Sequence, residues 1–157
     1  MSLTPGFRSA VDLFHKLQRD VARPDQEISD DQFFNLVITG YSLIDWVKND
    51  PPLPAAARTA EAIAALRNEP WLKVCGDLAN ASKHFVLTKR QPVTKEVTSQ
   101  AGWGIGRFGK RAYGEGERTI EVHIHGAPTW SALEFSVGAL QVWLQFFERH
   151  CVRITQS

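Results

Sequence analysis

Hydrophobic residues recur at intervals of three and four along most of the chain, which is the spacing of a helix with one buried face. Proline and small polar residues interrupt this pattern and mark where helices begin and end. We predict four helices from it, over about 5–22, from Ser29 to near Asn49, over about 54–67, and from Pro70 to near Val86.

The pattern changes at Pro92, where hydrophobic and polar residues begin to alternate. This alternation is typical of strands, and it predicts one strand from Val93 to Ser99 and a second over about 119–125. The helical spacing returns after Pro128-Thr129 and predicts a last helix to about Cys151. The sequence therefore predicts a mainly α protein, a bundle of four to five helices in a single domain over 1–157, with a β-hairpin excursion at about 92–125 before the last long helix.

Composition narrows the class of protein but not its partner. With 157 residues, 43% hydrophobic residues and a formal charge of +1, the chain is ordinary for one globular domain, and the net charge favours neither a nucleic acid nor a membrane. The two cysteines have neither the spacing of a metal site nor that of a disulfide framework. The sequence begins without a signal-peptide pattern, and no run approaches the roughly 18 apolar residues of a membrane span. We therefore expect a cytoplasmic protein with reduced thiols, without a membrane partner and without a cofactor.

One face of the fourth predicted helix is polar where an apolar face is expected. Lys73, Asp77, Asn80 and His84 follow one another at intervals of three and four, so they lie on one side of a helix and form a polar ridge. Asp and Asn are poor residues for the interior of a helix because their side chains compete for backbone hydrogen bonds. The polar ridge therefore needs a structural or a functional reason.

The second predicted helix carries a similar series, Tyr41, Asp45 and Lys48, and we expect it to face the polar ridge inside the bundle. Three interpretations follow. The polar ridge is a solvated surface with an i, i+4 ion pair, or it is a buried network in which Asp45, Asn80 and His84 fix the helix register. In the third interpretation it is a binding or catalytic site, in which His84 titrates and a carboxylate orients it.

The stretches 33–50 and 74–87 resemble a group of uncharacterised bacterial and phage-borne proteins. That group carries Asp-Trp followed later by Asp-[Ile/Leu]-Ala-Asn-x-x-Lys-His, and it is similar to the HEPN superfamily of small helical bundles. Many HEPN domains are ribonucleases of toxin, CRISPR and phage-defence systems, with an Arg-x(4-6)-His motif on a late helix that is completed by dimerisation. The resemblance implies a HEPN-like fold, an RNA or nucleotide partner, a homodimer, and His84 as general acid or base.

The arginine of that motif is missing here. The spacing requires it at positions 77 to 79, which are Asp77, Leu78 and Ala79. A carboxylate or the amide of Asn80 cannot replace a fixed cation that holds a scissile phosphate, and Lys83 supplies a cation without the expected spacing. We therefore expect a binding or interaction domain of a phage-defence or toxin-type system, with metal-independent RNA cleavage by His84, supported by Asp77, Asn80 and Lys83, as the alternative.

The long connection between the two predicted strands is the second candidate contact surface. It mixes cations with aromatic residues, which contact a phosphate backbone and stack on bases in nucleic-acid-binding proteins. Its glycines resemble a dinucleotide-binding fingerprint, but that fingerprint requires a helix after the glycines, and here the chain leads into another predicted strand. The predicted binding residues of this connection are Trp103, Arg107, Lys110 and Arg111. On the two helices, the predicted binding residues are Lys73, Tyr41 and Asp45.

Overall fold

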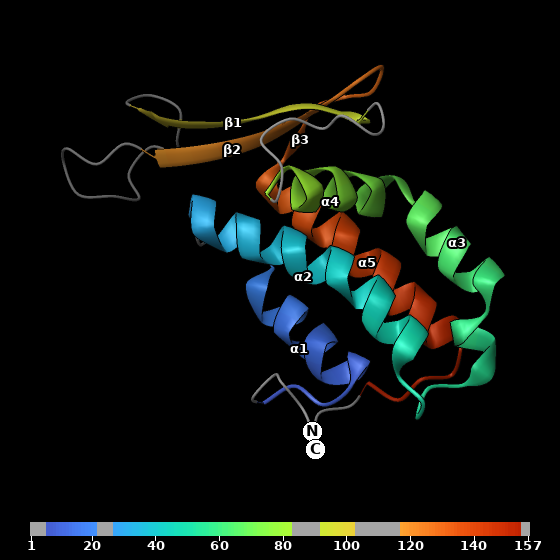
Figure 1. Ribbon diagram of the computed structural model, residues 1–157. Helices are drawn as coiled ribbons and strands as arrows, with labels where there is room; N and C mark the ends of the chain where they lie inside the picture. Colours follow the sequence, from blue (N-terminus) through green and yellow to red (C-terminus); the bar gives the residue numbers. More distant parts are fainter. Residues whose placement is uncertain (1–5, 22–26, 83–91, 103–116, 155–157) are drawn as a thin grey trace.

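The computed structural model describes residues 6–21, 27–82, 92–102 and 117–154. In these ranges five α-helices and one short 3-10 helix form a bundle, and a three-stranded antiparallel sheet forms a separate layer above one side of it (Figure 1). The predicted mainly α class, with a hairpin before the last helix, is confirmed. The helices are α1 (Ala10–Asp20), α2 (Asp30–Asn49), η1 (Ala55–Arg58, 3-10), α3 (Ala60–Asn68), α4 (Pro70–Ala81) and α5 (Ala132–Arg149).

Serine residues fix the beginnings of the three helices α1, α2 and α5. The hydroxyls of Ser9, Ser29 and Ser131 each accept the backbone N–H three residues later, and the side chain at that later position accepts the serine N–H. These reciprocal capping boxes satisfy N–H groups that a helix leaves unpaired at its first turn. The prediction that the first helix begins near residue 5 is wrong, because the cap that is used is Ser9.

Two other predicted boundaries also change. The segment predicted as one helix over 54–67 is divided at Thr59, whose hydroxyl accepts the Ala62 N–H at 3.1 Å and so begins α3 as a separate helix. The last helix begins at Ala132 and not directly after Thr129, because residues 130 and 131 pair with β2 as a short third strand. At residues 130 and 131, backbone pairing with β2 overrides the helical pattern of the sequence.

The sheet consists of β1 (Thr94–Gly102), β2 (Glu117–Ile124) and β3 (Trp130–Ser131), in the order β1-β2-β3. Its register places Val97 opposite Val122 and Glu96 opposite His123. Because side chains alternate along a strand, one face of the sheet is apolar and turns toward the helices, and the other is polar. A β-bulge between Thr94 and Glu96 interrupts the register at the beginning of β1.

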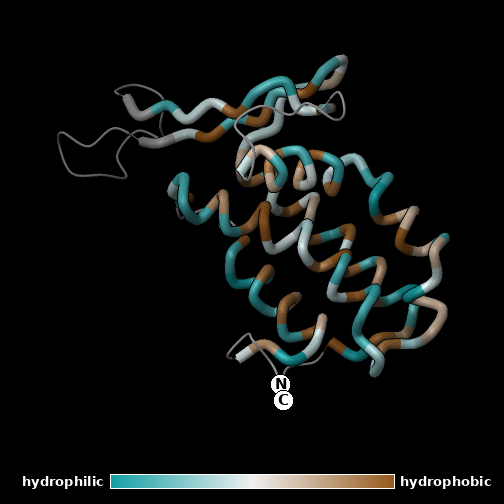
Figure 2. The backbone as a smooth tube through the Cα atoms, in the orientation of Figure 1, coloured by the Kyte–Doolittle hydropathy of each residue, from teal (hydrophilic) through white to brown (hydrophobic). Residues whose placement is uncertain are grey.

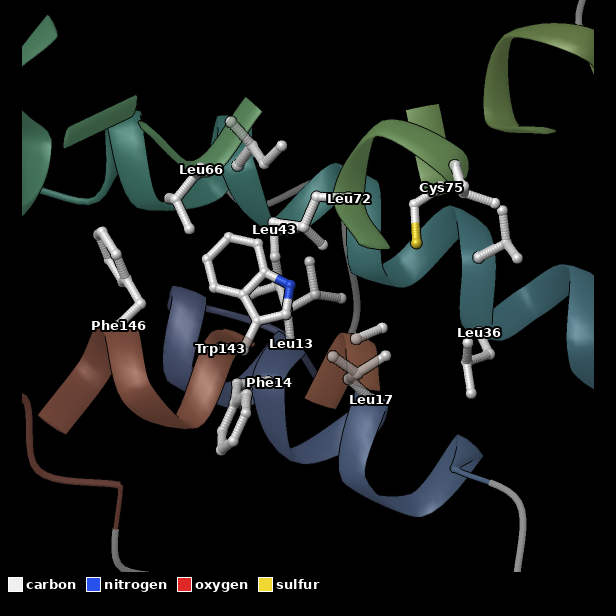
Figure 3. Close-up of a cluster of buried hydrophobic side chains, with 14 of the residues drawn as sticks. Leu13, Phe14, Leu17, Leu36, Leu43, Leu66, Leu72, Cys75, Trp143 and Phe146 are labelled. Atoms are coloured by element: carbon white, nitrogen blue, oxygen red, sulfur yellow. The ribbon is translucent and has the colours of Figure 1, made fainter. Parts of the chain in front are cut away.

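The bundle core is rich in aromatic residues. Trp143 of α5 is fully buried between α1, α2 and α4, and its Nε1 donates a hydrogen bond to the carbonyl oxygen of Gly40 at 3.2 Å (Figure 3). Phe147 meets Phe14 of α1 edge to face, with ring centroids 5.0 Å apart. Hydrophobic positions alternate with hydrophilic ones along each helix in Figure 2, which agrees with helices that bury one side.

Two glycines let aromatic rings lie directly on a helix backbone. A Cβ at Gly76 of α4 would lie 2.8 Å from Cε2 of Tyr41, which comes from α2. A Cβ at Gly138 of α5 would lie 2.5 Å from Cε2 of Trp71, which comes from α4. Both distances are shorter than carbon–carbon contacts allow, so α4 packs against α2 and α5 only because these side chains are absent.

Candidate binding site

Asp77 of the predicted polar ridge holds the sheet to the bundle. Its side chain is 2% exposed, and Oδ2 accepts hydrogen bonds from the backbone N–H of Val93 at 2.7 Å, the backbone N–H of Thr94 at 3.0 Å and the Thr94 hydroxyl at 3.1 Å. Thr94 is itself buried. A solvated ion pair is therefore the wrong interpretation for Asp77, because the carboxylate is withdrawn from solvent and joins α4 to the beginning of β1.

The structure separates the residues that were expected to face this ridge. Tyr41 is half-buried and its ring lies on α4 at Gly76, whereas Asp45, one turn further along α2, is exposed. Asp45 lines a different depression, on the side of α2 that meets the beginning of α1, together with Arg8. The expected buried network with Asp45 is therefore wrong. Lys73 and Asn80 are both half-buried on α4.

Several predicted site residues lie outside the described residues, and the predictions made for them stay predictions. They are the two candidate residues that follow α4 and the four in the connection between β1 and β2, namely Lys83, His84, Trp103, Arg107, Lys110 and Arg111.

The structure reveals an apolar groove that the sequence did not predict. It lies between α2, the end of α4 and the inner face of the sheet, and it has a volume of about 360 Å³. Volumes of this order are typical of small-molecule and side-chain binding pockets. The groove is lined by Asp30, Phe33, Phe34 and Val37 from α2, by Leu78, Ala81 and Ser82 from α4 and the residue after it, and by Val97, Ser99 and Ile120 from the sheet.

Phe34 gives this groove its most unusual feature. It is a large apolar residue of a largely buried helix, yet its side chain is 44% exposed. Phe33, the preceding residue of the same helix, is by contrast buried in the core, with 5% of its surface exposed. Ala81 of α4 is also exposed, on the opposite wall of the groove.

The described part of the chain does not gather the residues of a metal or thiol site. No group of three or more His, Cys, Asp or Glu side chains there is placed to hold a metal ion. Each ring nitrogen of His123 lies 3.1 Å from a threonine hydroxyl, of Thr98 and of Thr129, so its ring is part of the polar face of the sheet. Burial raises the pKa of the Cys75 thiol to about 12, which keeps it protonated and unreactive near neutral pH.

Comparison with protein families, with curated proteins and with solved structures finds no match for this chain. None of the helices in the described ranges combines the length and the apolar character that crossing a bilayer requires. The geometry of the described residues is therefore the basis for assigning a function.

Proposed function

We propose that this protein is a non-catalytic, HEPN-like interaction domain that binds a protein partner in the groove between α2, α4 and the sheet. The observation that carries the proposal is the groove itself, which combines a volume of about 360 Å³ with a mainly apolar lining and an exposed phenylalanine. Exposed apolar surface of this kind in a folded domain commonly marks a place where another apolar surface is bound.

The chemistry of the lining favours a polypeptide over a nucleic acid. The described lining residues include no lysine, arginine or histidine, and the charged residue among them, Asp30, is acidic. Phosphate backbones are bound mainly by cations, so this groove would repel them. RNA contact by the connection between β1 and β2 is a separate prediction, and a role in phage-defence or toxin systems is what the HEPN resemblance implies.

Catalysis is supported less well because of where Asp77 lies. In the enzyme hypothesis this carboxylate orients His84 or the substrate, and a carboxylate oxygen that contacts the substrate must face a site open to RNA. Its Oδ2 instead accepts three hydrogen bonds from Val93 and Thr94 in the interior. An anion at this position would also oppose the binding of a phosphate.

A neutral apolar dye tests whether the groove accepts a ligand. Nile red is expected to bind the wild-type protein with increased fluorescence, and Ala81→Leu is expected to reduce that binding because the larger side chain fills the groove. Ala64→Leu is the matched control, since Ala64 is an exposed alanine of α3 that does not line the groove. Equal dye binding by the wild type and both variants would contradict an open groove.

A photo-crosslinking amino acid tests the class of partner. Placed at Phe34, it is expected to crosslink to polypeptide in producing cells, and this crosslink is expected to disappear when Ala81→Leu is added. Val137, which is 40% exposed on α5, provides the matched apolar position away from the groove. Crosslinking mainly to RNA at Phe34, or equal crosslinking at both positions, would overturn the proposal.

A further inference from the structure

The hydrogen bonds of Asp77 lie where β1 begins, and β1 supplies part of the groove wall. Asp77 itself is buried and is not a lining residue, whereas its neighbour Leu78 does line the groove. Oδ2 of Asp77 accepts the backbone N–H groups of Val93 and Thr94 and the Thr94 hydroxyl, at 2.7, 3.0 and 3.1 Å. Because donors from two consecutive residues converge on one oxygen, they fix both the position and the direction in which the chain enters β1.

The sheet is attached to the bundle near both of its edges. At the β3 edge, the ring of Trp130 lies against Trp71 of α4, with ring centroids 3.7 Å apart. At the β1 edge, the hydrogen bonds of Asp77 join Thr94 to the same helix. Apolar contacts hold surfaces together without fixing a direction, whereas hydrogen bonds are directional. The Asp77 contact therefore sets how the β1 edge lies over α4.

We infer that Asp77 is a positioning residue for the groove, because its hydrogen bonds hold the β1 wall at the distance from α2 and α4 that ligand binding requires. This inference rests on the proposed function, since it names a residue that sets the affinity of the same groove. It gives this buried acidic residue of the polar ridge a role in binding without any contact with the ligand.

The groove is far enough from Asp77 for a small change in strand direction to matter there. From Thr94, β1 runs over the end of α4 toward the beginning of α2 (Figure 1). A strand rises about 3.3 Å per residue, so Val97 lies about 10 Å and Ser99 about 16 Å along β1 from Thr94, and a tilt of about 10° moves them by about 2–3 Å. A gap of only about 0.5–1 Å already removes a quarter to a half of an apolar contact.

The affinity for Nile red measures the effect on the groove. Asp77→Ala is expected to raise the dissociation constant of the dye about fivefold, because β1 is released, and Asp77→Asn, which keeps an oxygen acceptor, about twofold. Thr94→Val removes the hydroxyl and keeps both N–H donors, so it is also expected to raise the constant about twofold. It supplies the measurement if Asp77→Ala does not fold.

A variant that is destabilised elsewhere provides the matched control. Leu66 of α3 is buried and does not line the groove, so Leu66→Ala lowers stability without changing the position of β1. Its dissociation constant for the dye should stay within about twofold of the wild-type value. Each variant is measured at a temperature at which circular dichroism shows it to be folded.

A distance measurement reports the position of the sheet without any ligand. Pulsed dipolar spectroscopy uses spin labels at Gln100→Cys on β1 and Ala64→Cys on α3, two exposed positions, in a Cys151→Ser background. The distance distribution is expected to be narrow in the wild type, to broaden in Asp77→Ala, and to narrow again in Asp77→Asn. Labels at Ala64→Cys and Gln141→Cys, both on the helical bundle, should keep their distribution in every variant.

The outcomes separate this inference from the proposed function. Unchanged dye affinity in Asp77→Ala, or an unchanged distance between the sheet and the bundle, overturns the inference. An equal loss of affinity in Leu66→Ala also overturns it, because Asp77 would then act only through general stability. A wild type that does not bind the dye contradicts the proposed function instead, and the spin-label distances still decide whether Asp77 positions the sheet.

Discussion

Replacing Asp77 with alanine should detach the beginning of the sheet from the bundle. Among the described residues, Oδ2 of this carboxylate accepts three hydrogen bonds, two from backbone N–H groups and one from the hydroxyl of buried Thr94. Alanine offers no acceptor and leaves these donors without the partner that they have in the folded protein. The change therefore tests whether this acidic residue is there for structure.

The expected loss of stability follows from those three contacts. A hydrogen bond to a charged acceptor contributes about 1.5–3 kcal/mol, but three that share one oxygen do not add fully. We expect Asp77→Ala to lower the free energy of unfolding by about 3 kcal/mol, which corresponds to a fall in Tm of about 6–12 °C for a domain of this size. Asp77→Asn keeps an oxygen acceptor and loses the charge, so we expect about 1 kcal/mol.

Urea unfolding measures the global effect, and amide hydrogen exchange locates it. Exchange of the Thr94 amide should accelerate in Asp77→Ala, while exchange in the core around Trp143 should change only with global stability. Asp45→Ala is the matched control, because Asp45 is an exposed aspartate of α2, and its effect should stay within about 0.5 kcal/mol.

Two results would refute this reasoning. Equal stability of Asp77→Ala and Asp45→Ala would show that the three hydrogen bonds contribute little beyond those made with water. A large loss of stability without faster exchange at Thr94 would show that Asp77 acts elsewhere than at the beginning of β1.

Four further predictions concern single residues. Cys151 lies two residues after α5 with φ 54°, and the N–H of the next residue, Val152, donates to the Phe147 carbonyl at 2.9 Å and closes the helix end. Because glycine adopts a positive φ without strain, Cys151→Gly should raise Tm by about 2–4 °C in calorimetry. A thiol reagent should modify Cys151 rapidly and Cys75 only on unfolding, because Cys75 is buried and its thiol pKa is raised to about 12. The hydrogen bond from the backbone N–H of Arg8 lowers the pKa of Asp12 below its ordinary value of 3.8. The ionised Asp12 side chain therefore contributes fully to folding stability above pH 3.8, and this contribution is lost as the pH falls through the lowered pKa. Asp12→Asn should therefore lessen the decline of stability measured below about pH 4. Wild type and His84→Ala should both leave mixed RNA intact, and cleavage that depends on His84 would reverse the proposed function.

Periodicity predicted the helices well because each depends on a local pattern that one sequence window contains. The end of α2 at Asn49 and the change to strands after Pro92 agree with the structure. The partner of Asp77 was not predictable in this way, because the donors that it meets lie 16 and 17 residues further along the chain. Strand β3 was missed for a related reason, since two residues become a strand only when a neighbouring strand is already in place.

The groove was missed because periodicity assigns a helix to the core without deciding how wide its buried face is. Phe33 and Phe34 both fit an apolar helix in the sequence, and only the position of the sheet above α2 decides which of them is covered. Binding surfaces made by several elements depend on such relative positions. Their residues look like ordinary core residues in the sequence.

The two rings that rest on glycines imply a rule for how this chain changes during evolution. A side chain at position 76 requires a smaller residue at position 41, and a side chain at position 138 requires a smaller residue at position 71. In homologous sequences these positions should therefore vary as pairs, with glycine retained wherever the aromatic ring is retained. α4 takes part in both of these glycine–aromatic contacts. A mutation at either glycine therefore becomes tolerable only after the aromatic residue that packs on that glycine has been replaced by a smaller one.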